Sequence, residues 1–480
     1  MAATTRRNFL KASTLTAAAA ALAARKVNTY AKPKGDKPGT GLKASMAKRL
    51  VNPENGGVPR GHGSEEKVYN IHSELRVQAT VLEDENKNRV IFFACDFCDV
   101  NKTIIDQIKD HAKQKYNVPF ESFCFNVSHT HSAPALSEKE AHTPQCFDAE
   151  YAEFVIDEAK KVIDDAMQKF TLANLAYKEY LCTSVAINRR RLVDGLYVMD
   201  PNPDGPVDHR VEVIEITSAN DNSLIGAIIK YACHPVTVGP IGLGPDYPGF
   251  MRDYFEKKHP GATAMFIQGC CGNTRIQIVD QDVTKFTGKS VEVAMRFGRD
   301  LALSVEWALA QEGQQIKGPI KTSLGTIKLP LQKYSKETIE EIRNGRIEDC
   351  WRSYIDKWAE NFLAKIEAGE NLPTELDYMI QIISFGHNSS NPFIFVGLQD
   401  EVVTEYGFEI GNKLKNTNNI VAAYCNQRST YIPTAEILSQ GRYEADAPLI
   451  GNRFPARFSP QIEPLIINAA VDFAKQHLTF

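Results

Sequence analysis

Two histidines one residue apart follow a strand-like apolar segment. His129 and His131 lie in the segment 128–132 (Ser-His-Thr-His-Ser), directly after the apolar segment 123–127. Side chains two residues apart on an extended chain project from the same face, so the two imidazoles can converge. Converging imidazole nitrogens suit a zinc ion. A pair of hydrogen-bonded structural histidines is the alternative, because a single histidine is more often structural than a metal ligand.

Three further segments place a candidate metal ligand after a strand-like run. His234 follows the run 226–233, Asp400 and Glu401 follow the run 393–396, and Tyr431 follows 421–424 and a short loop. In layered α/β proteins, binding sites gather at the carboxyl ends of strands. Coincidence can explain any one of these positions, but it explains all of them together less well. The pattern therefore predicts one site assembled from distant segments.

Strand-like and helical patterns alternate around these positions. Expected strands are 68–82, 89–94, 120–127, 211–217, 224–233, 262–267, 379–385, 392–396 and 419–425. Expected helices are 102–115, 151–170, 291–311, 335–368 and 460–477, with a short helix that begins near Asp246. This alternation predicts an α/β fold of layered mixed β-sheets flanked by helices.

The first 24 residues differ from the rest of the chain. Arg6 and Arg7 precede a Phe-Leu-Lys triplet and a short run of small apolar residues, which resembles a twin-arginine signal peptide. We expect this segment to be removed on export to the periplasm or the outside of the cell. Residues 25–60 are expected to be a linker, and residues 61–480 the domain that carries the site. No later run is long and apolar enough for a transmembrane segment in the mature chain.

Composition excludes several classes of protein. The 480 residues include 59 acidic and 55 basic side chains, for a net charge of −4, and 43% are hydrophobic. This balance is that of a globular protein, and it excludes a disordered, collagenous or strongly basic nucleic-acid-binding chain. Ten cysteines are too sparse for a disulfide scaffold, so most are expected to be buried thiols.

Several motifs, in order, resemble the catalytic N-terminal domain of the neutral/alkaline non-lysosomal ceramidases. The Ser-His-Thr-His-Ser-Gly-Pro motif of that family is matched by residues 128–134, with alanine at the glycine position. Its remaining motifs are matched, some in part, by residues 70–72, 188–189, 234–235, 431–434 and 443–445. The resemblance extends from about residue 60 to residue 450. The chain stops at Phe480, so only the N-terminal catalytic domain of the family is expected.

The resemblance implies a zinc-dependent amidohydrolase of the N-acylsphingosine amidohydrolase type, with an N-acylated lipid as substrate. The implied zinc ligands are His129, His234, Glu401 and Tyr431. The implied catalytic residues are His131, Arg189 and Tyr443. Zinc bound in this way can lower the pKa of its water to around 7 and polarise a carbonyl group. His131 could then move a proton, and Arg189 could bind an oxyanion.

The chain departs from the family at the position of the proposed catalytic serine. Arg275 stands there, and Asn273 stands at the aspartate of the same motif. A fixed cation favours recognition of an anionic or polyhydroxyl group, unless it simply pairs with a nearby acid. The segment 189–206 starts with three arginines and is rich in turn residues, so we expect a loop. Arg190 and Arg275 are therefore the candidate substrate-binding residues.

Arg189, Arg190 and Arg275 suggest a second interpretation. In it, the protein is a carbohydrate-active enzyme (a glycan hydrolase or lyase) that acts on an acidic sugar at the same zinc site. A third interpretation is a binding protein without catalysis, although the presence of all four ligand types argues against it. In each case the expected partner is a small lipid or glycan, and not a nucleic acid.

Overall fold

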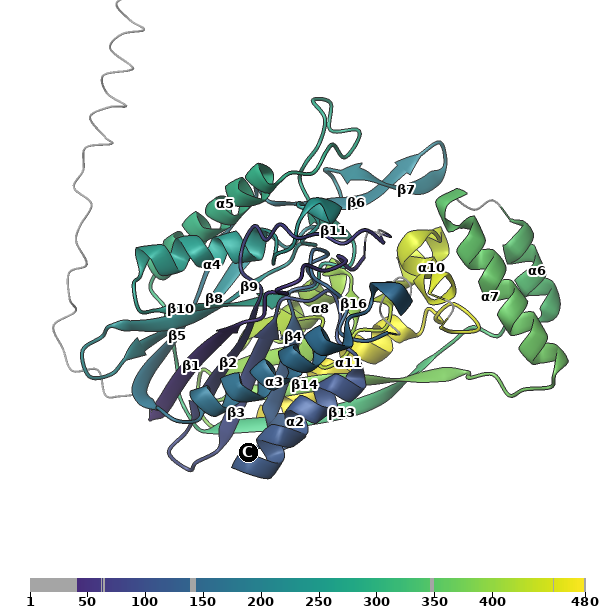
Figure 1. Ribbon diagram of the computed structural model, residues 1–480. Helices are drawn as coiled ribbons and strands as arrows, with labels where there is room; N and C mark the ends of the chain where they lie inside the picture. Colours follow the sequence, from purple (N-terminus) through teal and green to yellow (C-terminus); the bar gives the residue numbers. More distant parts are fainter. Residues whose placement is uncertain are drawn as a thin grey trace, which may run out of the picture. The chain divides into compact units, whose positions relative to one another are not determined.

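A mixed sheet of nine strands forms the centre of the fold in the computed structural model (Figure 1). The structure describes residues 41–61, 63, 65–138, 144–345, 349–451 and 453–478. The sheet order is β10-β9-β8-β5-β1-β2-β3-β4, and β12 pairs with β5. Its strands are β1 (Leu42–Leu50), β2 (Arg76–Glu83), β3 (Arg89–Cys95), β4 (Phe123–Val127), β5 (Thr171–Leu181), β8 (Arg210–Ser218), β9 (Leu224–Tyr231), β10 (Thr263–Gln268) and β12 (Gln314–Ile316).

A second sheet of four strands packs face to face against the first. Its order is β13-β14-β15-β17, formed by β13 (Ile320–Pro330), β14 (Glu375–Phe385), β15 (Phe393–Leu398) and β17 (Asn418–Ala422). One buried apolar cluster contains residues of both sheets, among them Phe92, Ile228 and Ile383. The rings of Phe92 and Phe395 meet edge to face, with centroids 5.1 Å apart. The interface between the two sheets is therefore the inner core.

Helices cover the outer faces of both sheets. On the nine-stranded sheet, α2 (Lys102–Tyr116) and α3 (Ala149–Ala166) lie over the β1–β4 side, and α4 (Tyr247–Lys258) and α5 (Val291–Leu309) lie over the β8–β10 side. On the four-stranded sheet, α8 (Thr404–Lys413) and α11 (Ile462–Leu478) pack against the outer face. Side-chain caps fix where several of these helices begin, such as Asn101 for α2 and Asp246 for α4.

Smaller elements lie around the ends of the sheets. β6 (Ala186–Val193), β7 (Leu196–Asn202) and β11 (Thr274–Ile276) form a three-stranded sheet, and β16 (Glu401–Val402) pairs in parallel with β18 (Tyr431–Ile432). The remaining helices are α6 (Lys336–Asn344), α7 (Asp349–Glu367), α9 (Ala435–Gln440), α10 (Tyr443–Ile450) and the short η1 (Phe120–Ser122), η2 (Pro144–Cys146) and η3 (Gly239–Ile241). α6 and α7 lie side by side, and α7 contacts α10 (Figure 1).

The predicted fold class is confirmed, since mixed sheets lie between layers of helices. Three local predictions are wrong. Residues 42–50 of the predicted linker form β1 inside the central sheet. The strand predicted to start at residue 68 starts at Arg76. The predicted arginine-rich loop is the β6–β7 hairpin, in which Arg189 to Arg191 belong to β6. The predicted signal peptide, residues 1–24, lies outside the described residues.

In the described part of the chain, no helix has both the length and the apolar character that crossing a membrane requires.

A buried ion triad supports the β8–β9 pair. The ammonium group of Lys230, 2% exposed, lies 2.7 Å from Asp208 Oδ2 and 2.7 Å from Glu212 Oε2. Removing the cation would leave two buried carboxylates close together. We therefore expect Lys230→Met to lower the free energy of unfolding by about 3–5 kcal/mol, measured by chemical denaturation.

Lys285→Met is the matched control. Its ammonium group is 67% exposed and pairs with Asp200, so the expected loss is below about 1 kcal/mol. Equal losses for the two variants would contradict the role given to the buried triad.

Candidate metal centre

The ends of several strands meet at one place. The side-chain amide of Gln268, the last residue of β10, donates to the carbonyl of Ser128 (2.9 Å) and to that of Cys233 (3.0 Å). The segments that follow β4 and β9 are thereby tied to the end of β10. These two segments carry His129 and His234.

The β16–β18 pair brings in the other two predicted ligands. Glu401 and Tyr431 are the first residues of these short parallel strands, and they are paired directly in the register. All four predicted ligands are buried, with His129 and Glu401 0% exposed. The structure therefore assembles the predicted set from four segments.

Ligand atoms of the centre lie at metal-binding separations. Glu401 Oε2 is 3.2 Å from His129 Nε2 and 3.1 Å from His234 Nε2. The hydroxyl of Tyr431 is 3.2 Å from His234 Nε2. Neighbouring ligands in a tetrahedral zinc site with bonds of about 2.0–2.1 Å are separated by about 3.3 Å. The observed distances match that spacing.

Backbone carbonyls fix the orientation of both imidazoles. The Nδ1–H of His129 donates to the carbonyl of Cys98 (2.6 Å), and that of His234 donates to the carbonyls of Cys271 and Thr274 (2.9 Å each). In a neutral imidazole with a proton on Nδ1, Nε2 carries a lone pair. Two lone pairs and a carboxylate oxygen therefore face one another, which is the arrangement that a metal cation requires.

Electrostatics distinguish the two histidines. Burial and the charge of Arg189 lower the pKa of His234 to about 3, so its imidazole is neutral. Burial also disfavours charge on His129, but the Glu401 carboxylate outweighs it and raises the pKa of His129 to about 10. A proton on His129 Nε2 and a metal ion would compete for the same lone pair, so binding of a metal would release that proton.

Arg428 fixes the carboxylate of Glu401. Its Nε (2.7 Å) and one terminal nitrogen both donate to Glu401 Oε1, which leaves Oε2 directed at the imidazoles. Its other terminal nitrogen donates to Asp99 Oδ2 at 2.8 Å, and Arg60 lies 3.4 Å from the same oxygen. Although burial opposes ionisation, Arg428 and His129 hold the pKa of Glu401 well below its ordinary value.

The backbone turns sharply next to the ligands. His129 has a φ of 63° and Asp400 a φ of 69°, in the left-handed region that non-glycine residues rarely adopt. Such conformations cost of order 1–3 kcal/mol each and are common at functional sites. Asp400, the other acid of the predicted pair, accepts from the backbone N–H groups of Ser429 and Thr430. It therefore shapes the loop that presents Arg428 and is not a ligand.

The predicted catalytic residues lie beside the centre. His131 Nε2 is 3.2 Å from His129 Nε2, so the second histidine of the motif lies next to the ligand set. The Arg189 guanidinium lies 5.4 Å from the ring of Tyr431 and 5.3 Å from that of Tyr443. The two tyrosine rings are 5.3 Å apart. His131, Arg189 and Tyr443 are thus brought together, and their catalytic roles stay predictions.

The two predicted substrate-binding arginines differ in environment. Arg190 is buried and donates to Glu444 Oε2 (2.5 Å) and Gln440 Oε1 (3.0 Å), so it ties β6 to α9 and α10. Glu444 also accepts from Arg189 Nε at 2.9 Å. Arg275 follows Thr274 in β11, and its backbone pairs with that of His234. Arg275 is therefore next to the centre, whereas the charge of Arg190 is already compensated.

Sequence reasoning did not identify Arg428, Asp99 or Glu444. Arg428 lies three residues before Tyr431, and Glu444 directly follows Tyr443, so proximity to predicted site residues was the available signal. Asp99 follows β3 and has no such neighbour. Their roles depend on contacts between distant segments.

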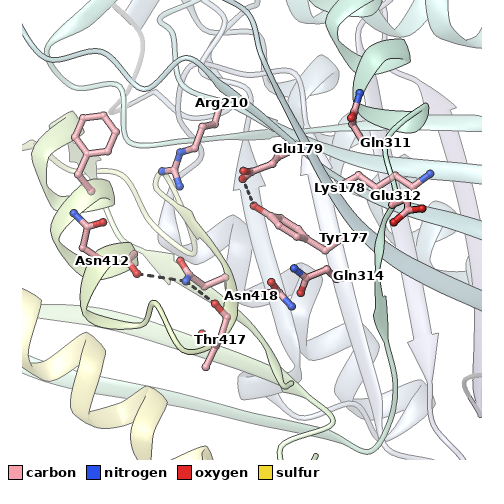
Figure 2. Close-up of a pocket in the computed structure, with 13 residues that line it drawn as sticks. Tyr177, Lys178, Glu179, Arg210, Gln311, Glu312, Gln314, Asn412, Thr417 and Asn418 are labelled. Carbon is pink, nitrogen blue, oxygen red and sulfur yellow. Dashed lines mark hydrogen bonds between the residues drawn. The ribbon is translucent and has the colours of Figure 1, made fainter. Parts of the chain in front are cut away.

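A separate polar cavity lies away from the centre (Figure 2). Its volume is about 450 Å³, and it is lined by residues of β5, the start of β8, the 311–314 segment, α8 and the start of β17. Two charged groups in its wall are paired, since Tyr177 donates to Glu179 at 2.8 Å and Arg210 donates to Asp208 at 2.8 Å. None of the predicted site residues lines this cavity.

Comparison with known proteins confirms the resemblance suggested by the motifs. Residues 61–260 match the family described as neutral/alkaline non-lysosomal ceramidase, N-terminal. No curated protein matches the sequence.

Two solved structures share the fold. A neutral ceramidase from Pseudomonas aeruginosa is similar with a TM-score of 0.67 at 15% identity, covering 91% of this chain and 75% of the other. A ceramidase complexed with C2 has the same TM-score and identity, with coverage of 90% and 75%. The chain therefore has a neutral-ceramidase-like fold. His129 and His234 fall inside the family match, and Glu401 and Tyr431 lie beyond it.

The centre predicts a specific metal content. We expect the purified protein to hold about one zinc ion per chain and His234→Ala to hold little, because the variant loses a ligand that nothing else replaces. His259→Ala is the control, since His259 pairs with Glu306 on the α4–α5 surface. Elemental analysis measures both. Absence of zinc in the wild type after incubation with the metal would contradict the assignment.

Arg428 is expected to tune metal affinity without binding the metal. Arg428→Gln frees Glu401 Oε1 to rotate, so zinc affinity should fall by about 10- to 100-fold in a chelator competition. Arg457→Gln removes an arginine that pairs with Asp446 and should leave the affinity unchanged. Equal affinities for Arg428→Gln and the wild type would show that Glu401 does not need this support.

Proposed function

We propose that this protein is a zinc-dependent hydrolase that cleaves an amide bond in an N-acylated substrate, such as an N-acyl lipid. The observation that carries the proposal is the convergence of two imidazole Nε2 atoms and Glu401 Oε2 within 3.1–3.2 Å, next to the Tyr431 hydroxyl. The match to the ceramidase family over residues 61–260 supports the amide bond as the target. The twin-arginine-like segment supports a periplasmic or secreted location.

His129, His234, Glu401 and Tyr431 would hold the zinc ion. When bound, zinc supplies an activated water and polarises the carbonyl of the scissile amide.

His131 is proposed to move the proton. Its half-buried imidazole lies beside the ligand set, and an imidazole can accept a proton from water and give one to the departing amine.

Tyr443 is proposed to stabilise the oxyanion. Burial raises the pKa of Tyr443 despite the opposing charge of Arg189, so the phenol keeps its proton and can donate a hydrogen bond. Arg189 is held by Glu444 and by the carbonyl of Gly272 at 2.6 Å. This anchored cation keeps the two tyrosine rings in place.

Attack by water, without an acyl-enzyme, agrees with the residues at the position of the ceramidase serine. Arg275 is not a nucleophile. The hydroxyl of Thr274 donates to the carbonyls of Ala232 and Cys271, at 3.3 Å each. The acidic-glycan alternative relied on Arg189, Arg190 and Arg275. Glu444 pairs with Arg189 and with Arg190, which leaves Arg275 as the support of this alternative.

A hydrolysis assay tests the proposal. The zinc-loaded protein is expected to release sphingosine from short-chain N-acylsphingosine, or ethanolamine from N-acylethanolamine, in mixed micelles. His131→Gln should lower kcat by about 10²–10⁴-fold with zinc content unchanged, because only the proton transfer is lost.

His111→Gln is the control, since this histidine binds Asp164 on the surface of α2 and α3. A zinc-loaded wild type that releases neither amine would contradict the proposed reaction, and an unchanged kcat in His131→Gln would contradict the role of that residue.

A further inference from the structure

Arg275 is held beside a ligand of the metal centre. Its backbone pairs with that of His234, and β11 pairs with β6 in a register that sets Arg275 opposite Ile187. The neighbouring side chains in β11, Thr274 and Ile276, are buried. Side chains alternate along a strand, so Arg275 projects to the opposite side from these two.

The guanidinium of Arg275 has no counter-ion among the described residues. Within that part of the chain the guanidinium makes neither a hydrogen bond nor an ion pair, and its Nε is buried without an acceptor. One face of the group is covered by the ring of Phe286, at 4.1 Å. The stacked ring leaves the N–H groups at the edge of the guanidinium plane as its hydrogen-bonding surface.

The other arginines of the centre are different. Arg189 and Arg190 share Glu444, and Arg428 binds Glu401 and Asp99. Each of these three arginines therefore has an acidic partner among the described residues, whereas Arg275 has none. A partly buried guanidinium without a partner is destabilising, which makes it a functional-site candidate.

Positive charges near Arg275 lower the pKa of neighbouring cationic side chains. Burial and the charge of Arg189 lower the pKa of Arg275 to about 10, so the group is still charged at neutral pH. Burial and the charge of Arg275 lower the pKa of Lys289 to about 8. The wall that carries Arg275 would gain stability from a bound anion.

We propose that Arg275 binds an anionic oxygen group of the substrate, a carboxylate, sulfate or phosphate ester, in a subsite beside the metal centre. The inference rests on the proposed amide hydrolase and narrows its substrates to acidic N-acyl compounds. A guanidinium edge binds such groups through two parallel hydrogen bonds, which gives orientation as well as affinity. Because Arg275 is adjacent to His234 in the backbone, the acidic group would lie close to the scissile amide.

Two probes of matched shape test the subsite on the zinc-loaded, full-length protein. N-Octanoylglycine carries a carboxylate, and N-octanoylglycinamide is its neutral counterpart. We expect the wild type to prefer the acidic probe in kcat/KM, and Arg275→Gln to reduce that preference by about 10- to 100-fold. Arg275→Lys, which keeps the charge but not the fork of donors, should retain part of the preference.

Inorganic sulfate provides a readout that does not depend on catalysis. Calorimetry at constant ionic strength, with chloride as the reference anion, should show sulfate binding to the wild type and at least tenfold weaker binding to Arg275→Gln. Arg191→Gln is the matched control, because Arg191 lies on the adjacent strand and donates only to the carbonyl of Val283 at 2.9 Å. The control should bind sulfate as the wild type does.

The outcomes separate the two proposals. If neither amide is cleaved but sulfate binding depends on Arg275, the anion subsite stands and the proposed hydrolase fails. If both probes are cleaved equally and Arg275→Gln binds sulfate as tightly as the wild type, the subsite is overturned and the hydrolase stands. Equal weakening in Arg275→Gln and Arg191→Gln would also overturn it, because a general loss of positive charge would then explain the effect.

Discussion

Two imidazole Nε2 atoms and one carboxylate oxygen face one another at a buried point, and the surrounding structure holds them there. Without support, these side chains could rotate toward hydrogen-bond donors elsewhere. The carbonyls of Cys98, Cys271 and Thr274 prevent the rings from turning, because each accepts the Nδ1–H of a histidine. A divalent cation would be stabilised by this arrangement, so the four positions form a candidate metal centre.

Charges alternate outward from that point along two chains of side chains. On one side, Glu401 is followed by Arg428, Asp99 and Arg60. On the other side, Glu444 lies between Arg189 and Arg190 and connects α10 to the β6 hairpin. The first chain pairs two acids with two arginines, whereas in the second chain Arg189 and Arg190 share one carboxylate, so every arginine in these chains has an acidic partner. Arg275 belongs to neither chain, and this difference distinguishes a structural arginine from one available to a substrate.

The sequence was sufficient for the layered fold, because that fold depends on local signals, and the family resemblance supplied the candidate ligands, whose role in binding a metal stays a prediction. Apolar runs predicted most strands, and the segments after them carried His129, His234, Glu401 and Tyr431. It was insufficient where position depends on distant partners. β1 has only a short apolar alternation after a stretch rich in glycine and proline, so its place between β2 and β5 was not visible. The β6–β7 hairpin was predicted as a loop because its first strand contains consecutive arginines. Arg189 and Arg190 are buried there, and Glu444 pairs with both.

The ligands are far apart along the chain: His234 lies 167 residues from Glu401 and 197 residues from Tyr431. Contacts this far apart in sequence carry the chain-entropy cost of closing long loops, so they depend on the rest of the fold. The native state alone offers all four ligands, so free metal draws the folding equilibrium toward it by mass action. A fragment that ends at residue 260, the limit of the family match, would hold two of the four ligands and lack the carboxylate. The candidate metal centre thus needs an intact chain from residue 129 to residue 431, and a chain cut between these residues would separate its ligands.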